Sequence, residues 1–281
     1  MKEILSVTNP EVKHLVSLRQ KSSVRRETGT FVIEGERLVL DAPPEAIVTV
    51  YVTAQVCDRM GAALRARIPE ECMVILSDSA MEKASDTKSP QGILAEVLQP
   101  RWDPDEVMGA HPLQRLGAPD GRRAALLLAL EDVRDPGNLG TIFRTAEAAG
   151  ASGLILTDRC ADVFNPKTVR ATMSAIFRMP FVTTGNLPAV LEGLRERSIQ
   201  ICAACLRKGS VSYETLDYRG PTAFLVGNEA NGLRDETIQA ADAAVQIPMQ
   251  GQIESLNAAI SAGILLYEAA RQRGFSQRGY R

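Results

Sequence analysis

The chain has 281 residues, of which 45% are hydrophobic and 23% charged, and its formal net charge is −2. This length predicts two domains, and this composition is typical of a folded globular protein rather than a disordered one. The N-terminus lacks the apolar core of a signal peptide and the apolar run Ala124–Leu130 is too short to span a bilayer, so we expect a cytoplasmic protein without a membrane anchor.

The 5 cysteines are an odd number and lie far apart, which favours reduced thiols. Cys202 and Cys205 have the spacing of a redox or metal-binding pair, but they stand in the apolar run Ile201–Leu206, which is typical of a buried strand. No second cysteine pair exists, and His14 and His111 are remote in sequence. We therefore favour core residues over chemistry for this pair, and we expect no metal.

Residues 1–98 combine helical and strand-like patterns. Asn9 and Pro10 predict the start of a helix that continues to about Leu18. Short strands are expected at Thr30–Ile33, Val48–Thr53, Met73–Leu76 and Ile93–Leu98. These patterns predict a small α/β domain, and the stretch 99–123, punctuated by proline and glycine, predicts a linker.

Basic residues gather in two parts of the chain despite the negative net charge. The N-terminal group consists of Lys13, Arg19, Lys21, Arg25, Arg26 and Arg37. The C-terminal group consists of Arg271, Arg273, Arg278 and Arg281. Such groups are either ordinary solvated surface or a footprint for RNA phosphates, and charge alone leaves both interpretations open.

From Ala124 to the C-terminus, expected strands and helices alternate. The strands are Ala125–Leu130, Gly153–Leu156, Phe181–Thr183, Ile199–Leu206, Thr222–Val226 and Ala244–Ile247. The helices are Leu139–Ala149, Pro166–Ile176, Leu187–Arg197, Asp235–Ala241 and Ser255–Arg271. This alternation predicts an α/β fold with a mostly parallel sheet, whose ligands bind beyond the carboxyl ends of the strands.

The loop after the first of these strands has strong turn chemistry. Asp135 to Asn138 reads Asp-Pro-Gly-Asn, and we expect Asn138 to cap the following helix. That helix is otherwise largely apolar, and Arg144 directly follows the apolar residues Ile142 and Phe143. An arginine at such a position is suited to pairing with an anion near the strand ends.

Two later loops also follow strands. In Gly227–Leu233, glycines that permit close backbone approach bracket a single carboxylate, Glu229, although an ordinary connection would look the same. The stretch Pro248–Asn257 leads into the last helix, where Asn257 would be a buried amide that protein or ligand must satisfy.

Together the three loops resemble, in order and spacing, the motifs of the SpoU (TrmH-like) family of the SPOUT RNA methyltransferases, over residues 124–273. The N-terminal stretch, with Asn9-Pro10, the basic run and Phe31–Arg37, is similar to the substrate-binding domain that precedes many of these enzymes and resembles RNA-binding ribosomal proteins. The resemblance implies a parallel sheet with a deep C-terminal trefoil knot, a homodimer, and S-adenosylmethionine bound by the knot loops.

The resemblance also implies roles for single residues. The positions that match cofactor contacts are Gly227, Ile247 and Leu256, with Met249 nearby. The positions that match catalytic and site-shaping residues are Asn138, Arg144, Glu229, Ser255 and Asn257. The chain departs from the family where Ala171-Thr-Met-Ser174 replaces a usual Ser-Ala-Gly stretch, and where Ala259 replaces a small hydroxyl residue.

The expected activity is methylation of a ribose 2′-hydroxyl in RNA, with large-subunit ribosomal RNA favoured over transfer RNA. Arg144 would hold a phosphate and stabilise the forming alkoxide, because a guanidinium is a poor base; its use as a base is the other account. The alternatives are a non-catalytic RNA-binding or ribosome-assembly factor that retained the fold, and a nucleotide-binding enzyme that acts on a small molecule.

Overall fold

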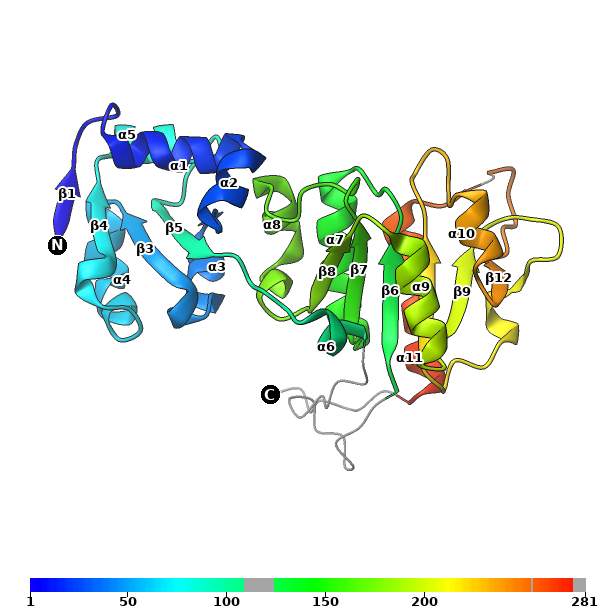
Figure 1. Ribbon diagram of the computed structural model, residues 1–281. Helices are drawn as coiled ribbons and strands as arrows, with labels where there is room; N and C mark the ends of the chain where they lie inside the picture. The colour runs from blue at the N-terminus through cyan, green and yellow to red at the C-terminus, as the bar shows by residue number, and fades with distance from the viewer. Residues whose placement is uncertain (109–123, 254, 275–281) are drawn as a thin grey trace. The chain divides into compact units, whose positions relative to one another are not determined.

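The computed structural model describes residues 1–108, 124–253 and 255–274 (Figure 1). The chain divides into two compact units, and the first of them is discontinuous in sequence. It consists of Met1–Arg101 together with Asp162–Phe177, and the second consists of Trp102–Ala161 and Arg178–Arg281.

The first unit is built on a 5-stranded sheet in the order β1-β4-β3-β5-β2. The strands are β1 (Lys2–Ile4), β2 (Thr30–Glu34), β3 (Ile47–Val52), β4 (Met73–Leu76) and β5 (Ile93–Leu98). β5 pairs antiparallel with β2 and β3, whereas β4 pairs parallel with β1 and β3. The four strands expected from the sequence are present, and the short edge strand β1 was not foreseen.

Helices from the N-terminal part of the chain accompany these strands (Figure 1). They are α1 (Pro10–Gln20), α2 (Ser22–Thr28), α3 (Glu36–Asp41), α4 (Ala54–Arg65) and α5 (Asp78–Ala84). Asn9 caps α1 as its sequence predicts, since its side chain accepts a hydrogen bond from the Glu11 amide. Val12, Leu15 and Leu18 are fully buried in a core with α5 and the sheet, so the expected small α/β domain forms.

The segment 162–177 contains α8 (Pro166–Thr172), which is shorter than expected. The sequence predicts a helix to Ile176, but Met173 and Ser174 adopt left-handed conformations, with φ of 50° and 70°. Two left-handed residues in a row end the α-helical hydrogen-bond series, and a short 3₁₀ turn follows at Ala175–Phe177. Buried Ser174 donates a hydrogen bond to Asp41 over 2.8 Å, which stabilises this conformation.

The second unit contains a 7-stranded sheet in the order β10-β12-β9-β11-β6-β7-β8. Its strands are β6 (Leu126–Leu130), β7 (Gly153–Thr157), β8 (Phe181–Thr184), β9 (Gln200–Ala204), β10 (Val211–Ser212), β11 (Thr222–Val226) and β12 (Ala243–Gln246). Every pairing is parallel, which confirms the predicted sheet. The central strands β6 and β11 are buried at all five positions, as expected of a sheet covered on both faces.

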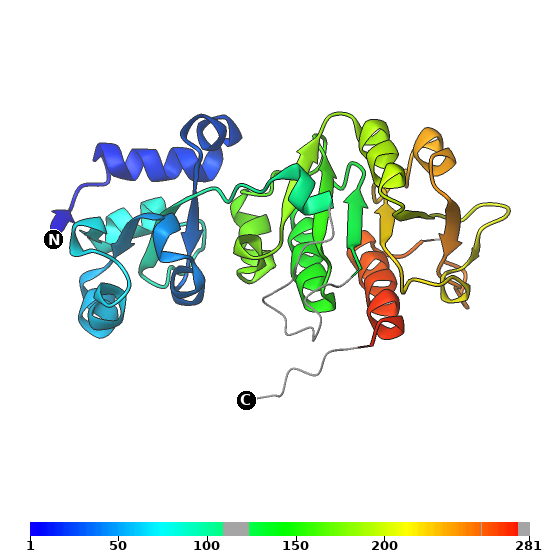
Figure 2. The ribbon, with the colours of Figure 1, turned by 60° about the horizontal axis from the view of Figure 1, so that its bottom comes forward.

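Helices α7 (Pro136–Ala149) and α11 (Ala258–Gln272) pack against each other, and α11 also packs against the central strands β11 and β6 (Figures 1 and 2). A separate core joins α9 (Leu187–Glu196) to the sheet. α10 (Asp235–Gln239) follows β11. α6 (Pro104–Met108) lies within the stretch expected to be a linker, yet its Val107 is fully buried beside Gly153; residues 109–123 of that stretch lie outside the described residues.

The path into α11 decides the architecture of the site. β12 is separated from β11 by β9, but α11 packs on α7, β11 and β6. The segment between β12 and α11 therefore runs back over the carboxyl ends of the central strands. The trefoil knot that the resemblance implies stays a prediction.

Candidate active site

Two of the three loops meet because their strands are neighbours. β6 and β11 pair parallel with Leu130 opposite Val226, so the loops that follow them leave the same edge of the sheet side by side. The third loop reaches this place at its end, where Asn257 contacts Asn138 at the start of α7. The sheet order thus brings together segments that are about 90 to 120 residues apart in the chain.

A single amide, that of Asn138, connects all three loops. Its Nδ2 donates to Oε1 of Glu229 over 3.0 Å, and its Oδ1 accepts from Nδ2 of Asn257 over 2.9 Å. The prediction that Asn138 caps its helix is wrong. Asp135 caps α7, because its side chain accepts a hydrogen bond from the backbone N–H of Asn138 over 2.8 Å, and Pro136 is the first helical residue. Relieved of capping, the Asn138 side chain is available to reach the other loops.

Glu229 is held as an ionised acceptor. Besides the Asn138 amide, the backbone N–H groups of Arg134 and Asp135 lie 3.4 Å from its carboxylate oxygens. Burial alone would raise the pKa of Glu229, but the hydrogen bonds from Asn138 and from these backbone groups outweigh it and lower the pKa. A carboxylate with a lowered pKa orients its partners and is poorly suited to donating a proton at neutral pH.

The loop that carries Glu229 folds back tightly on itself. Asn228 and Gly232 exchange backbone hydrogen bonds of 3.1 and 2.9 Å. A side-chain carbon on Gly227 would lie 2.2 Å from the carbonyl carbon of Gly232, so only glycine fits at this position. The sequence pattern was right about the close backbone approach, and the approach is to the loop's own backbone.

Asn257 does not sit inside the last helix. The expected start at Ser255 is wrong by three residues, because α11 begins at Ala258 and Asn257 is its N-cap, accepting from the amides of Ala259 and Ile260. The side chain is exposed, not buried as expected, and its second bond is the one to Asn138. Ser255 is exposed two residues before this cap.

Arg144 lies outside this hydrogen-bonded group. It is exposed on α7, and its guanidinium forms no hydrogen bond or ion pair with any residue that the structure describes. Arg144 lies six positions after Asn138 in this helix, which corresponds to about 9 Å along the axis. An exposed and unpaired guanidinium is available to an anion such as a phosphate.

The residues expected to bind the cofactor occupy the same loops. Gly227 is buried at the end of β11, and Ile247, Met249 and Leu256 are half-buried along the segment that returns from β12. Partly open apolar side chains are typical of the lining of a site for an adenosyl group. These residues fit S-adenosylmethionine.

The six basic residues expected to contact RNA fall into two groups. Those with exposed side chains are Lys13, Lys21, Arg26 and Arg37. Arg25, expected to contact RNA, is instead 3% exposed: it donates to Asp162 over 3.1 Å and to the carbonyl oxygens of Leu18 and Arg19 at the end of α1. A guanidinium buried in this way caps a helix C-terminus and does not face a nucleic acid.

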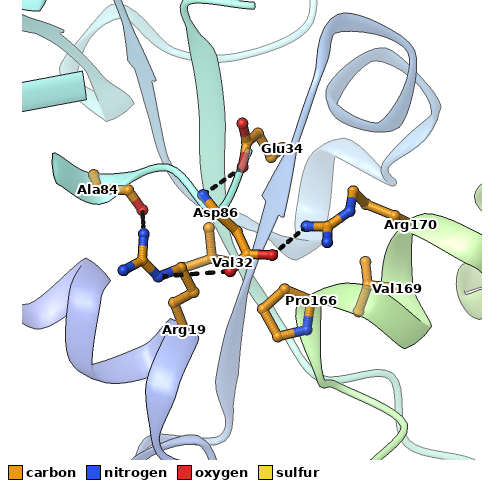
Figure 3. A pocket seen from close by; sticks show the side chains of 8 residues that line it. All are labelled: Arg19, Val32, Glu34, Ala84, Asp86, Pro166, Val169 and Arg170. Atoms are coloured by element: carbon orange, nitrogen blue, oxygen red, sulfur yellow. Dashed lines mark hydrogen bonds and ion pairs between the residues drawn. The ribbon is translucent and has the colours of Figure 1, made fainter. Parts of the chain in front are cut away.

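Arg19 is also occupied, in a small ion-pair cluster (Figure 3). Arg170 lies 2.7 Å from one carboxylate oxygen of Asp86, and Arg19 lies 3.9 Å from the other. Arg19 also donates to the carbonyl oxygen of Ser85, while the Asp86 amide donates to Glu34 over 2.9 Å. The cavity between them, about 10 Å³, has room for one water molecule and not for a ligand.

The cysteine pair lies in and directly after β9. Cys202 is buried in β9 and burial raises the pKa of its thiol to about 12, as expected of a core residue, and Cys205 is half-buried. Within residues 1–108, 124–253 and 255–274, no group of three or more metal-ligating side chains occurs. None of the helices found there is both long and apolar enough to cross a membrane.

A model of the SpoU rRNA Methylase family matches residues 125–267. The chain belongs to this family. A second model, of an MRM3-like substrate binding domain, matches residues 9–95. The two matches together cover both the strand-and-helix half of the chain and the N-terminal α/β domain.

Relatives of this SpoU protein match nearly its whole length. The 23S rRNA (guanosine(2553)-2'-O)-methyltransferase RlmP of Bacillus subtilis is 33% identical over 95% of this chain and 98% of its own. The crystal structure of an AdoMet-bound rRNA methyltransferase from Sinorhizobium meliloti has a TM-score of 0.80, 35% identity, and 96% and 97% coverage of the two chains. The SpoU methyltransferase AviRb of Streptomyces viridochromogenes, in complex with AdoMet, has a TM-score of 0.78, 27% identity, and 94% and 98% coverage.

Sequence reasoning missed several residues that build the site. Asp135 is the true cap of α7, and Glu131 and Asp132, at the end of β6, contact the loop after β11. The available signal was a pair of acidic residues directly after a fully apolar strand, where burial makes an unpartnered carboxylate costly.

Proposed function

We propose that this protein transfers the methyl group of S-adenosylmethionine to a ribose 2′-hydroxyl of 23S ribosomal RNA. The observation that carries the proposal is the hydrogen-bonded chain from Glu229 through Asn138 to Asn257, which joins the three loops of a SpoU-family site. The full-length relatives support the substrate, since RlmP is named for 2′-O-methylation of 23S rRNA, and the AdoMet-bound structures support the cofactor.

Bound S-adenosylmethionine supplies an electrophilic methyl group. The protein therefore mainly has to position the two reactants and stabilise the charge that develops on the ribose oxygen. Gly227, Ile247, Met249 and Leu256 would hold the cofactor at the carboxyl edge of the sheet, with Ser255 beside it. The hydrogen bonds among Glu229, Asn138 and Asn257 hold the three loops together. These side chains orient groups, and they transfer no proton.

Arg144 is the residue we assign to the substrate. A ribose hydroxyl is a weak nucleophile, and its developing negative charge needs a cation. The guanidinium of Arg144, exposed and without an ion pair to any described residue, is suited to holding the adjacent phosphate and stabilising the forming alkoxide. With a pKa above about 12, it is a poor choice of base.

Residues 1–98 would bind the RNA, 99–123 would link the two parts, and 124–281 would carry the reaction. The exposed Lys13, Lys21, Arg26 and Arg37 would contact phosphates, and an unpaired loop is the expected target because its riboses are accessible. A uridine-specific relative, the 23S rRNA (uridine(2479)-2'-O)-methyltransferase of Streptomyces viridochromogenes, is 29% identical. Since RlmP acts on a guanosine, we do not assign the nucleobase of the modified nucleotide.

We further propose that the protein acts in the cytoplasm as a homodimer formed through the second unit. On the outer side of α11, Ile260 is 54% exposed and Tyr267 44% exposed, and half-buried Ile264 lies between them on the same helical face. Such an apolar stripe on a helix is typical of an interface. Sedimentation velocity at micromolar concentration should give twice the 30.4 kDa mass of the chain; a monomer would contradict the dimer.

The activity is tested with radiolabelled S-adenosylmethionine and 23S rRNA, and the site by mapping 2′-O-methyl marks in RNA from cells with and without the gene. Arg144→Lys keeps the charge but loses the planar fork, and should lower kcat by about 100-fold or more while the Kd for S-adenosylmethionine changes by less than about twofold. If Arg144→Lys abolished cofactor binding instead, the assignment of Arg144 to the substrate would be wrong.

The same measurements separate the alternatives. A non-catalytic RNA-binding factor would show no heat of binding in a calorimetric titration with S-adenosylmethionine. A small-molecule enzyme would bind the cofactor but no RNA. Labelling of transfer RNA, with ribosomal RNA left unlabelled, would move the substrate to the other RNA class.

A further inference from the structure

Glu131 is a buried carboxylate that none of the roles above uses. It directly follows β6 and is 2% exposed. Three donors surround it: the Thr237 hydroxyl at 2.7 Å, the Arg234 amide at 2.8 Å, and Nε of Arg234 at 2.9 Å. A carboxylate buried so completely is costly unless it is fully hydrogen-bonded, so these bonds are strongly favoured.

Each of these partners lies just after the loop that carries Gly227 and Glu229. Arg234 follows Leu233, and Thr237 is in the first turns of α10. Glu131 therefore fixes the point at which this loop ends. Glu131 itself is the first residue of the neighbouring loop, which leads from β6 to Asn138.

Two further contacts join the same pair of loops. Nδ2 of Asn228 donates to the carbonyl oxygen of Asp132 over 2.8 Å, and the amides of Arg134 and Asp135 approach Glu229. Asp132 itself has a φ of 58°, and Thr157 on β7 holds it with hydrogen bonds of 2.9 and 2.7 Å. The Gly227–Leu233 loop is thus bonded to the neighbouring loop near its start, at Glu229, and just after its end.

We infer that Glu131 is a positioning residue that holds the Gly227–Leu233 loop in its binding conformation before the cofactor arrives. This inference rests on the proposed function of the loop. Without the carboxylate, the end of the loop is free to leave the sheet, and cofactor binding must first order it. When only a fraction of molecules is competent to bind, the apparent Kd rises by the inverse of that fraction.

The test is Glu131→Gln, which preserves the shape of the side chain but removes its charge and one acceptor oxygen. Calorimetry with S-adenosylmethionine should show a Kd raised by about tenfold or more, as for a loop that is closed in about one molecule in ten. The KM for the cofactor should rise equally, while kcat at saturating cofactor stays within about threefold of the wild type.

The matched control is Glu96→Gln in the first unit. Glu96 is 8% exposed and accepts from the Thr30 hydroxyl at 2.7 Å and from Nε2 of His14 at 3.0 Å, so it is likewise a buried, hydrogen-bonded carboxylate. Its loss should lower the melting temperature without changing the Kd for S-adenosylmethionine. The control separates the general cost of neutralising a buried carboxylate from an effect on the loop.

The outcomes are distinct. If the wild type binds S-adenosylmethionine and Glu131→Gln binds it within twofold, well below the melting temperature of both, the inference is overturned. If the wild type does not bind it, the proposed function itself fails. Should Glu131→Gln not fold, Thr237→Val, which removes one donor, takes its place: a Kd raised by about threefold or more supports the inference, and an unchanged Kd refutes it.

Discussion

Replacing Asn138 tests whether one amide holds the three loops of the site together. Asn138→Ala removes the bond to Glu229 at 3.0 Å and the bond to Asn257 at 2.9 Å. A neutral hydrogen bond contributes about 1 kcal/mol net, and a bond to a carboxylate about 1.5 kcal/mol or more, with the lower value fitting an exposed Glu229. Alanine recovers about 0.5 kcal/mol of helix propensity in α7.

The free energy of unfolding should therefore fall by about 2 kcal/mol in Asn138→Ala. Asn138→Asp should cost more, because it loses the donor and places a second carboxylate about 3 Å from that of Glu229. In water this repulsion amounts to about 1 kcal/mol. Lowering the pH until one carboxylate is protonated should remove this repulsion, and Asn138→Asp should then be at least as stable as Asn138→Ala.

Urea unfolding followed by circular dichroism measures these differences, and a double-mutant cycle isolates the bond to Asn257. Asn257→Ser is the suitable partner substitution because serine still caps α11 but cannot reach Asn138. The cycle should give a coupling energy of about 1 kcal/mol. A coupling near zero, or an Asn138→Asp variant as stable at neutral pH as Asn138→Ala, would refute the proposed junction.

Two further predictions concern protonation and backbone strain. The pKa of Glu229 is lowered from 4.5 in the folded protein, so its stabilisation is complete above that pH and is lost as the pH falls through the lower, folded-state value. The difference in unfolding free energy between wild type and Glu229→Gln should shrink between about pH 6 and pH 3, and a difference that grows on acidification would contradict the sign. Ser174 has a φ of 70° and donates to Asp41. Ser174→Gly and Ser174→Ala both lose that bond but only alanine keeps the strain, so thermal melting should rank glycine above alanine by about 1 kcal/mol; the reverse order would argue against a left-handed Ser174.

Much of the fold was predictable because local patterns dictate it. Alternating apolar runs and helical segments gave the parallel sheet of the second unit, and Asn9-Pro10 gave the start of α1. The loops that carry Asn138, Gly227 and Asn257 were also predictable, because glycine, proline and asparagine clusters follow buried strands. Family resemblance then supplied roles that spacing alone left open.

Helix ends were predicted less well, because competing caps are decided by geometry. Asp135 and Asn138 are both good capping residues, and only the structure shows Asp135 in that role. The end of α8 depends on left-handed residues at Met173 and Ser174, whose cost is offset by a hydrogen bond to Asp41, 133 residues away. A local pattern contains no information on such a partner.

The sequence by itself determined which residue types stand after which strands, and hence that Asn138, Glu229 and Asn257 lie in the connections that follow strands, at one edge of a sheet. Only the tertiary structure decided that β6 lies beside β11, that the chain returns from β12 to reach α7, and that one amide joins the three loops. It also decided that Arg25 turns inward while Arg26 faces solvent. The physical reason is that hydrogen-bond partners and burial depend on strand order and on packing between distant segments, which neighbouring residues in the chain do not encode.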